Sequence, residues 1–245
     1  MPLWLIPAFF GTALLYSSVG FGGGSTYSAL LALAGTDYRI LPILSLACNV
    51  VVVTGGTIRF ARAREMPWRG ALTLSLVAAP LAFLGGLTPI KQATFLALLG
   101  GSLVFTALAL LLPVSSDGEA REQRGWTMPL AAAPLGYLAG LVGIGGGIFL
   151  APVLHLTRWN SARRIAATAS LFILINSLAG LVGQLVKSGF ARFGEALGGG
   201  LPLLLAVVVG GQIGSYLALR FLPARVIRRL TAALTGWVGL RLLTG

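Results

Sequence analysis

Two clusters of glycines carry the residues of this chain that are best suited to chemistry. Residues 19–24 read VGFGGG and residues 142–147 read VGIGGG, so five of the six positions are identical. Each cluster lies inside an apolar run, where a helix rarely tolerates four glycines in five positions, because glycine costs about 1 kcal/mol per helical position relative to alanine. A helix that restarts after such a break presents unpaired N–H groups and a partial positive charge, and these bind anions.

Polar side chains near both clusters complete a predicted anion site. Half-helices that start at Gly24 and Gly147 would point their N–H groups into the centre of the protein from two sides. Glycine lets the backbone approach a ligand closely, and hydroxyl and amide groups add donors. The candidate substrate-binding residues are Gly22, Gly23, Gly24, Ser25, Thr26, Asn49, Gly145, Gly146, Gly147, Ser170 and Asn176.

The same residues also have structural interpretations. Gly20 and Gly24 have the spacing of a small-xxx-small packing surface. Asn49 and Asn176 are equally suited to interhelical hydrogen bonds. The hydroxyls in the other helices more often bond back to their own helix, and the glutamines are interpreted as structural; these residues are Ser45, Thr168, Ser170, Gln184 and Gln212.

The composition is that of a membrane protein. The chain of 245 residues is 56% hydrophobic and 10% charged, with a mean hydropathy of +0.90, whereas soluble domains carry roughly 25% charged residues. A net charge of +12 would suggest nucleic acid in a soluble protein, but in a membrane protein loop arginines set the orientation. We therefore expect no nucleic-acid partner. The single cysteine, Cys48, excludes a disulfide framework and a multi-thiolate metal site, and we expect neither metal nor cofactor.

The chain contains an internal repeat. The first and fifth of eight apolar segments are too long for one crossing, which needs about 20 residues, and a glycine cluster breaks each of them. We predict a first membrane repeat over 1–113, a linker over 114–126 and a second membrane repeat over 127–245. The eight segments are 3–34, 39–60, 69–87, 92–113, 127–157, 164–187, 197–220 and 226–244.

The distribution of basic residues predicts how the two repeats are related. If each broken segment crosses the bilayer once, the 18 lysines and arginines divide nine to nine. If each broken segment is a re-entrant hairpin, the repeats are inverted and the division becomes thirteen to five, as the positive-inside rule expects. We therefore predict an all-α polytopic protein of two inverted repeats, each a broken helical hairpin plus three transmembrane helices. The linker would be cytoplasmic, with both termini outside.

Acidic residues are missing from the predicted membrane core. A carboxylate proton relay or a cation site would need one there, so their absence favours an anionic substrate. The only histidine, His155, is expected at the membrane interface or as a pH-sensitive gate. All six carboxylates fall in loops or at interfaces: Asp37, Glu65, Asp117, Glu119, Glu122 and Glu195.

The second repeat resembles the sulfite exporter TauE/SafE family. The resemblance rests on VGIGGGIFLAPVL at 142–154, ATASL at 167–171 and LPAR at 222–225. It extends over both halves, although the first departs from it with Phe21, Ser25 and Thr26. The resemblance implies a polytopic transporter of small anions such as sulfite or organosulfonates, in the cell (plasma) membrane.

The predicted function is therefore secondary transport of a small anion, with export as its direction. The alternatives are a passive anion channel, an intramembrane serine protease that pairs Ser25 with His155, and a structural or assembly role. The protease lacks an orienting acid in the predicted core. The expected partners are the anion and the lipid bilayer, and a homo-oligomer is left open.

Overall fold

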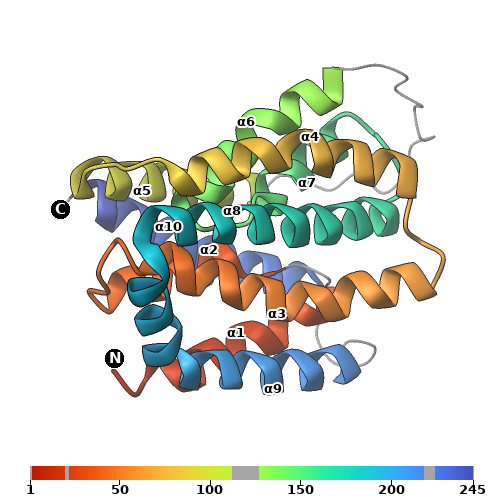
Figure 1. Cartoon of the computed structure of the whole chain (residues 1–245). Helices are drawn as coiled ribbons and strands as arrows, with labels where there is room; N and C mark the ends of the chain where they lie inside the picture. The colour runs from red at the N-terminus through yellow and green to blue at the C-terminus, as the bar shows by residue number, and fades with distance from the viewer. Residues whose placement is uncertain (1, 20–21, 112–126, 218–223, 245) are drawn as a thin grey trace.

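The computed structural model describes residues 2–19, 22–111, 127–217 and 224–244, and within these ranges every regular element is a helix. Figure 1 shows long helices that run roughly parallel or antiparallel in one bundle. The all-helical fold class is confirmed. The predicted linker 114–126 lies outside the described residues. The helices are α1 (Leu5–Val19), α2 (Gly24–Leu33), α3 (Leu41–Arg62), α4 (Trp68–Leu87), α5 (Gln92–Leu111), α6 (Thr127–Val142), α7 (Gly147–Leu156), α8 (Ala162–Gly199), α9 (Leu201–Leu217) and α10 (Ala224–Thr244).

Both overlong segments are broken at their glycine clusters, as the sequence predicts. Helix α2 restarts at Gly24 and helix α7 restarts at Gly147. The residue before each restart is left-handed, with φ 79° at Gly23 and φ 78° at Gly146. A side chain at either position would be strained in this conformation, so glycine is required at both breaks for a conformational reason.

Helix α8 is longer than the sequence predicts. The predicted segment ends at residue 187, but the helix continues to Gly199 after a kink at Gly189, which has φ 78° and ψ 160°. Figure 1 shows the last turns of α8 bent away from the rest of the helix. The polar residues from Lys187 to Arg192 look like a loop in the sequence. Lys187 and Ser188 instead end the long part of α8, and a short helical part directed sideways follows the kink, because glycine at 189 permits a backbone geometry that other residues avoid.

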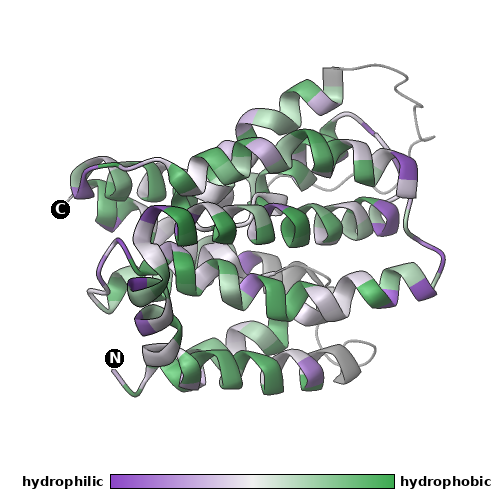
Figure 2. Ribbon diagram, in the orientation of Figure 1, coloured by the Kyte–Doolittle hydropathy of each residue, from purple (hydrophilic) through white to green (hydrophobic). Residues whose placement is uncertain are grey.

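The bundle carries apolar side chains on its outside and polar side chains within. Leu76, Phe105, Leu108 and Phe190 are among the exposed apolar residues, which is the arrangement expected of a lipid-facing surface. Helices α3, α4, α5 and α8 are long and apolar enough to cross a bilayer. In Figure 2 most of the hydrophilic colour lies toward the two ends of the long helices. The polar residues buried inside include Thr12, Ser25, Ser28, Ser45, Asn49, Thr106, Thr168, Asn176, Ser177 and Gln184.

The main helix pairs join one half of the chain to the other. Helix α1 packs on α9, and its counterpart α6 packs on α4; α3 packs on α8, and α5 packs on α10. Small residues allow these close approaches. A Cβ atom at Gly214 would meet the backbone of Leu14, and one at Gly140 would meet the carbonyl of Ala82.

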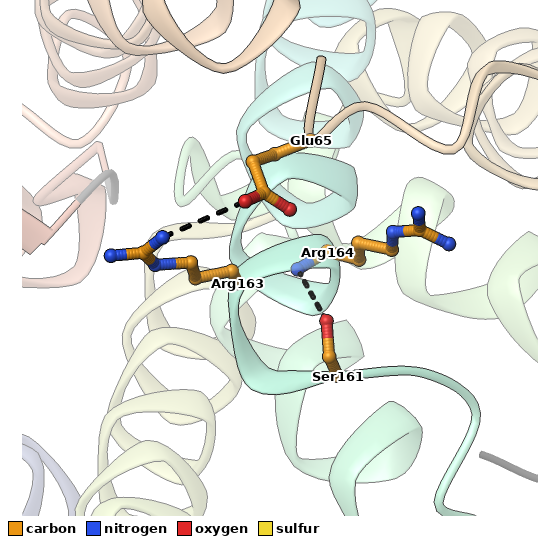
Figure 3. A network of polar contacts seen from close by, with 4 residues as sticks. All are labelled: Glu65, Ser161, Arg163 and Arg164. Carbon is orange, nitrogen blue, oxygen red and sulfur yellow. Dashed lines mark hydrogen bonds and ion pairs between the residues drawn. The ribbon is translucent and has the colours of Figure 1, made fainter. Parts of the chain in front are cut away.

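The loops form two groups at opposite ends of the bundle. The α3–α4 loop lies beside the α7–α8 loop, where Glu65 forms an ion pair with Arg163 at 3.6 Å (Figure 3). Arg39, after α2, lines one cavity together with Lys187 and Arg192 of α8. In Figure 1 the first hairpin, α1–α2, opens toward the end that carries the N-terminus, whereas α6–α7 opens toward the opposite end.

Candidate functional site

Asn49 of α3 lies where the two glycine breaks meet. Its side-chain nitrogen donates a hydrogen bond of 3.0 Å to the carbonyl oxygen of Ile144, inside the second break. A Cβ atom on Gly22 would be 2.5 Å from the Asn49 Oδ1 atom, and one on Gly145 would be 2.7 Å from its nitrogen. A Cβ on Gly24 would meet both Asn49 and the Ile144 carbonyl oxygen. Asn49 therefore touches the first hairpin and is hydrogen-bonded to the second.

Several polar side-chain atoms of α2, α3 and α8 are buried without a hydrogen-bond partner. They include the hydroxyl oxygens of Ser25 and Ser177 and the Oδ1 atoms of Asn49 and Asn176. These four residues have exposed fractions of 1% or less. An unsatisfied buried polar group costs about 1–3 kcal/mol, and such a group in a native structure needs an explanation. A bound polar ligand would provide one, because a hydroxyl group can donate a hydrogen bond and an amide oxygen can accept one.

The first hairpin is held by its own hydroxyl groups. Ser28 donates to Ser45 on α3 at 2.9 Å, and Ser45 donates to the carbonyl oxygen of Gly24 at 3.1 Å. The Tyr16 and Thr26 hydroxyls lie 2.9 Å apart and join α1 to α2. These bonds fix the restart of α2 and leave Ser25 as the hydroxyl of the first turn without a partner.

The second hairpin is held by apolar packing instead. A Cβ on Gly146 would be 2.9 Å from the Cβ of Ala139 and 3.0 Å from Phe172, and a Cβ on Gly147 would run into Ile173. No side chain caps the N-terminus of either α2 or α7. Both helix starts therefore keep backbone N–H groups that side chains do not satisfy.

The structure brings together some of the predicted site residues and separates others. Gly22, Gly24, Asn49 and Gly145 share one contact region, with Ser25 next to it in sequence. Ser170 is elsewhere on α8, where its hydroxyl lies 2.9 Å from that of Thr57 on α3. A Cβ on Gly23 would meet Thr12, Tyr16 and Tyr27. The remaining predicted residues, Thr26, Gly146 and Gly147, contact the neighbours named above.

Hydrogen bonds of the other polar residues test the structural interpretations. Thr168 bonds back to Arg164 at 2.8 Å, as expected. Ser45 and Ser170 do not bond back to their own helix but across to other helices, so that expectation is wrong for both. Asn176 donates to the carbonyl of Phe172 in its own helix at 2.8 Å. Gln184 joins α8 to Gly140 of α6 at 3.3 Å, which is the predicted structural role.

Ser177 lies beside the second break but was not among the candidate residues of the sequence argument. Its hydroxyl oxygen would lie 2.9 Å from a Cβ on Gly145, and it is fully buried. The signal available in the sequence was its place beside Asn176 in an apolar helix. Which of two adjacent polar residues faces the break depends on the rotation of α8, and sequence spacing leaves that rotation open.

The chemistry of this region suits an anion that is bound without a full opposite charge. None of the buried residues that the structure describes is an aspartate, glutamate, lysine or arginine. The available groups are hydroxyls, amides and the positive ends of two half-helices. Charged donors and general bases are absent from these described buried residues, whereas both halves of the chain contribute weak hydrogen-bond donors.

The fold and the site together define a helical membrane transporter built from two broken hairpins. The family model for the sulfite exporter TauE/SafE matches residues 5–242, and the chain belongs to this family. It is 33% identical over 242 residues to the probable membrane transporter protein y4hK of Sinorhizobium fredii, covering 96% of each chain. It is 24% identical over 262 residues to a probable membrane transporter protein of Methanocaldococcus jannaschii, covering 99% of this chain and 95% of that one. No solved structure matches significantly. The family and these relatives are membrane transporters rather than enzymes.

Proposed function

We propose that this protein is a secondary transporter that exports a small anion, such as sulfite or an organosulfonate, across the plasma membrane. The anion would bind near the bilayer midplane between the two glycine breaks. The observation that carries the proposal is the meeting of both breaks at Asn49. The unpartnered hydroxyl of Ser177 lies beside Gly145, and that of Ser25 belongs to the residue after Gly24. Each hydrogen bond to a charged partner contributes roughly 1.5–3 kcal/mol, so a few such donors are enough for specific binding.

We further propose that the two repeats are inverted, an arrangement that would support a carrier. Three observations support the inverted arrangement. They are the pairing of helices between the two halves, the Glu65–Arg163 ion pair and the opposite openings of the hairpins in Figure 1. Residues 59–69 and 158–164 then share one face, which carries most of the arginines and would be cytoplasmic. The linker 114–126 would lie on the same face.

The close contact between the breaks favours a carrier over a passive channel. The space between Gly24 and the Ile144 carbonyl cannot take even a methyl group, so an anion would enter only when the hairpin tips separate. A carrier whose hairpins move alternately provides that separation, and movement of repeats around a fixed central site is a known mode of secondary transport. A channel would need a continuous path through the same contact.

The test is a flux assay in proteoliposomes with radiolabelled sulfite and with sulfoacetate. We expect saturable uptake that is accelerated by unlabelled substrate on the opposite side. The control is Gly101→Ala, at a helical position where an added Cβ meets nothing within 4 Å. Current that rises linearly with voltage and never saturates would indicate a channel. No flux of either anion by well-folded protein would contradict the proposal.

A further inference from the structure

A basic cavity opens at the end of the bundle opposite the Glu65–Arg163 ion pair. It has a volume of about 230 Å³ and is formed by the α2–α3 loop, the α4–α5 loop, the start of α3, the end of α6 and the kinked part of α8. Its charged lining residues are Arg39, Lys187 and Arg192, and no carboxylate lines it. The sequence argument treated these three residues only as orientation signals.

The fold holds the three cations around this cavity for identifiable reasons. Gly189 kinks α8 and so turns Arg192 toward the same cavity that Lys187 lines. Arg39 donates from its side chain to the Tyr38 hydroxyl at 3.2 Å. The nearby carboxylate of Asp37 accepts the backbone N–H of Arg39 at 2.9 Å. The cavity therefore keeps an excess of positive charge from two separate parts of the chain.

The inner wall of the cavity adjoins the second glycine break. Pro42 and Leu141 line the cavity, and Leu141 stands one residue before the end of α6. A Cβ on Gly143, inside the break, would be 2.6 Å from the Cα of Pro42. The cavity wall at Pro42 is thus in direct contact with the second break.

We propose that this cavity is a second binding site for small oxyanions, through which the transported anion passes on the outer face. The inference rests on the proposed function for the identity of the anion, but the binding itself follows from the three cations and the apolar inner wall. Like charges placed around a partly enclosed space concentrate counter-ions. A free oxyanion and the phosphate of an anionic lipid share the chemistry that this cavity recognises.

The experiment measures the charge of the cavity without requiring transport. A reporter cysteine replaces Ser188, which lines the cavity, in a Cys48→Ala background reconstituted in vesicles of zwitterionic lipid. Its rates of modification by an anionic and by a cationic methanethiosulfonate reagent are compared with those of 2-mercaptoethanol. We expect the ratio of the anionic to the cationic modification rate to be about tenfold or more above the same ratio for 2-mercaptoethanol. Millimolar sulfate should slow modification by the anionic reagent.

Charge-neutralising variants identify the source of the effect. Arg39→Gln, Lys187→Gln and Arg192→Gln should each lower the ratio by about threefold. The matched control Arg62→Gln, at the opposite end of the bundle, should leave it unchanged. Three results would overturn the proposal. The first is a rate ratio equal to that of 2-mercaptoethanol, and the second is an equal effect of Arg62→Gln. The third is protection of the cysteine that appears only when anionic lipid is added. A high rate ratio without sulfite flux would support this second site and contradict the proposed function. Sulfite flux with a rate ratio equal to the reference would support the proposed function and contradict the second site.

Discussion

The two glycine breaks have nearly the same sequence, and each has a left-handed glycine before its half-helix, but their surroundings differ. Around the first break, hydroxyls of Ser28, Ser45 and Thr26 join the hairpin to its neighbours. Around the second, Ala139, Phe172 and Ile173 pack against the glycines. The asparagines that follow the breaks differ in the same way, because Asn49 reaches across to Ile144 whereas Asn176 bonds within its own helix.

This difference shows that a repeated scaffold can carry an unequal site. The left-handed glycine before each half-helix is required by the turn itself, so it is preserved in both halves. The donors are not required by the turn. In the proposed site, the first half would supply Ser25 and Asn49, whereas the second would supply mainly backbone, with Ser177 beside it. Variants at matched positions in the two halves should separate these contributions.

The largest expected difference between the two halves is the side of the membrane toward which each hairpin opens. In a Cys48→Ala background, Thr36→Cys follows α2 and Asn160→Cys follows α7. Because the hairpins open at opposite ends of the bundle, an impermeant thiol reagent added to intact cells should label position 36 and leave position 160 unlabelled. Labelling of both positions from outside, with lysed cells as the control for reactivity, would contradict opposite openings.

Valine at the left-handed glycines should give the next largest effect. Gly23→Val and Gly146→Val each place a β-branched residue at a φ near +78°, where any L-residue costs roughly 1–2 kcal/mol. The half-helix would shift from its starting point, and we expect sulfite flux to fall at least a hundredfold. Gly101→Val is the control for expression and insertion. Wild-type flux from both variants would leave the glycines with a packing role only.

The two asparagines should differ in their effect on substrate affinity. Asn49→Leu removes the bond to Ile144 and a group at the meeting point of both breaks, so the half-saturation concentration should rise about tenfold to a hundredfold. Asn176→Leu removes a bond within one helix, and we expect a rise of less than about threefold. Equal effects would show that the site is symmetric. A change in thermal stability alone, with affinity unaltered, would make both residues structural.

Ser25 should show the cleanest effect. Its hydroxyl has no partner, so Ser25→Ala breaks no hydrogen bond and should not lower the thermal stability. If the hydroxyl donates to the anion, affinity should fall about tenfold. Ser75→Ala, which removes a buried hydroxyl bonded within α4, is the matched control. Unchanged affinity in Ser25→Ala at normal stability would remove this residue from the site.

The sequence predicted the scaffold better than the site. Overlong apolar segments broken by glycines are a strong local signal, since both length and glycine content are fixed by the bilayer and the backbone, and α2 and α7 begin at the expected residues. The continuation of α8 past Gly189 was missed because its polar residues resemble a loop. The side-chain assignments for Ser45, Ser170 and Ser177 depended on helix rotation and packing, which short polar patterns do not determine.

The central claim is that both halves of the chain contribute to one anion site. Its most direct test is equilibrium binding of labelled sulfite to purified protein, for Ser25→Ala of the first break, Ser177→Ala beside the second, and the double variant. We predict one binding site between the breaks, to which each single change weakens binding about tenfold, with a further loss in the double variant. A competition curve with two independent components, each altered by only one of the two changes, would contradict a shared site.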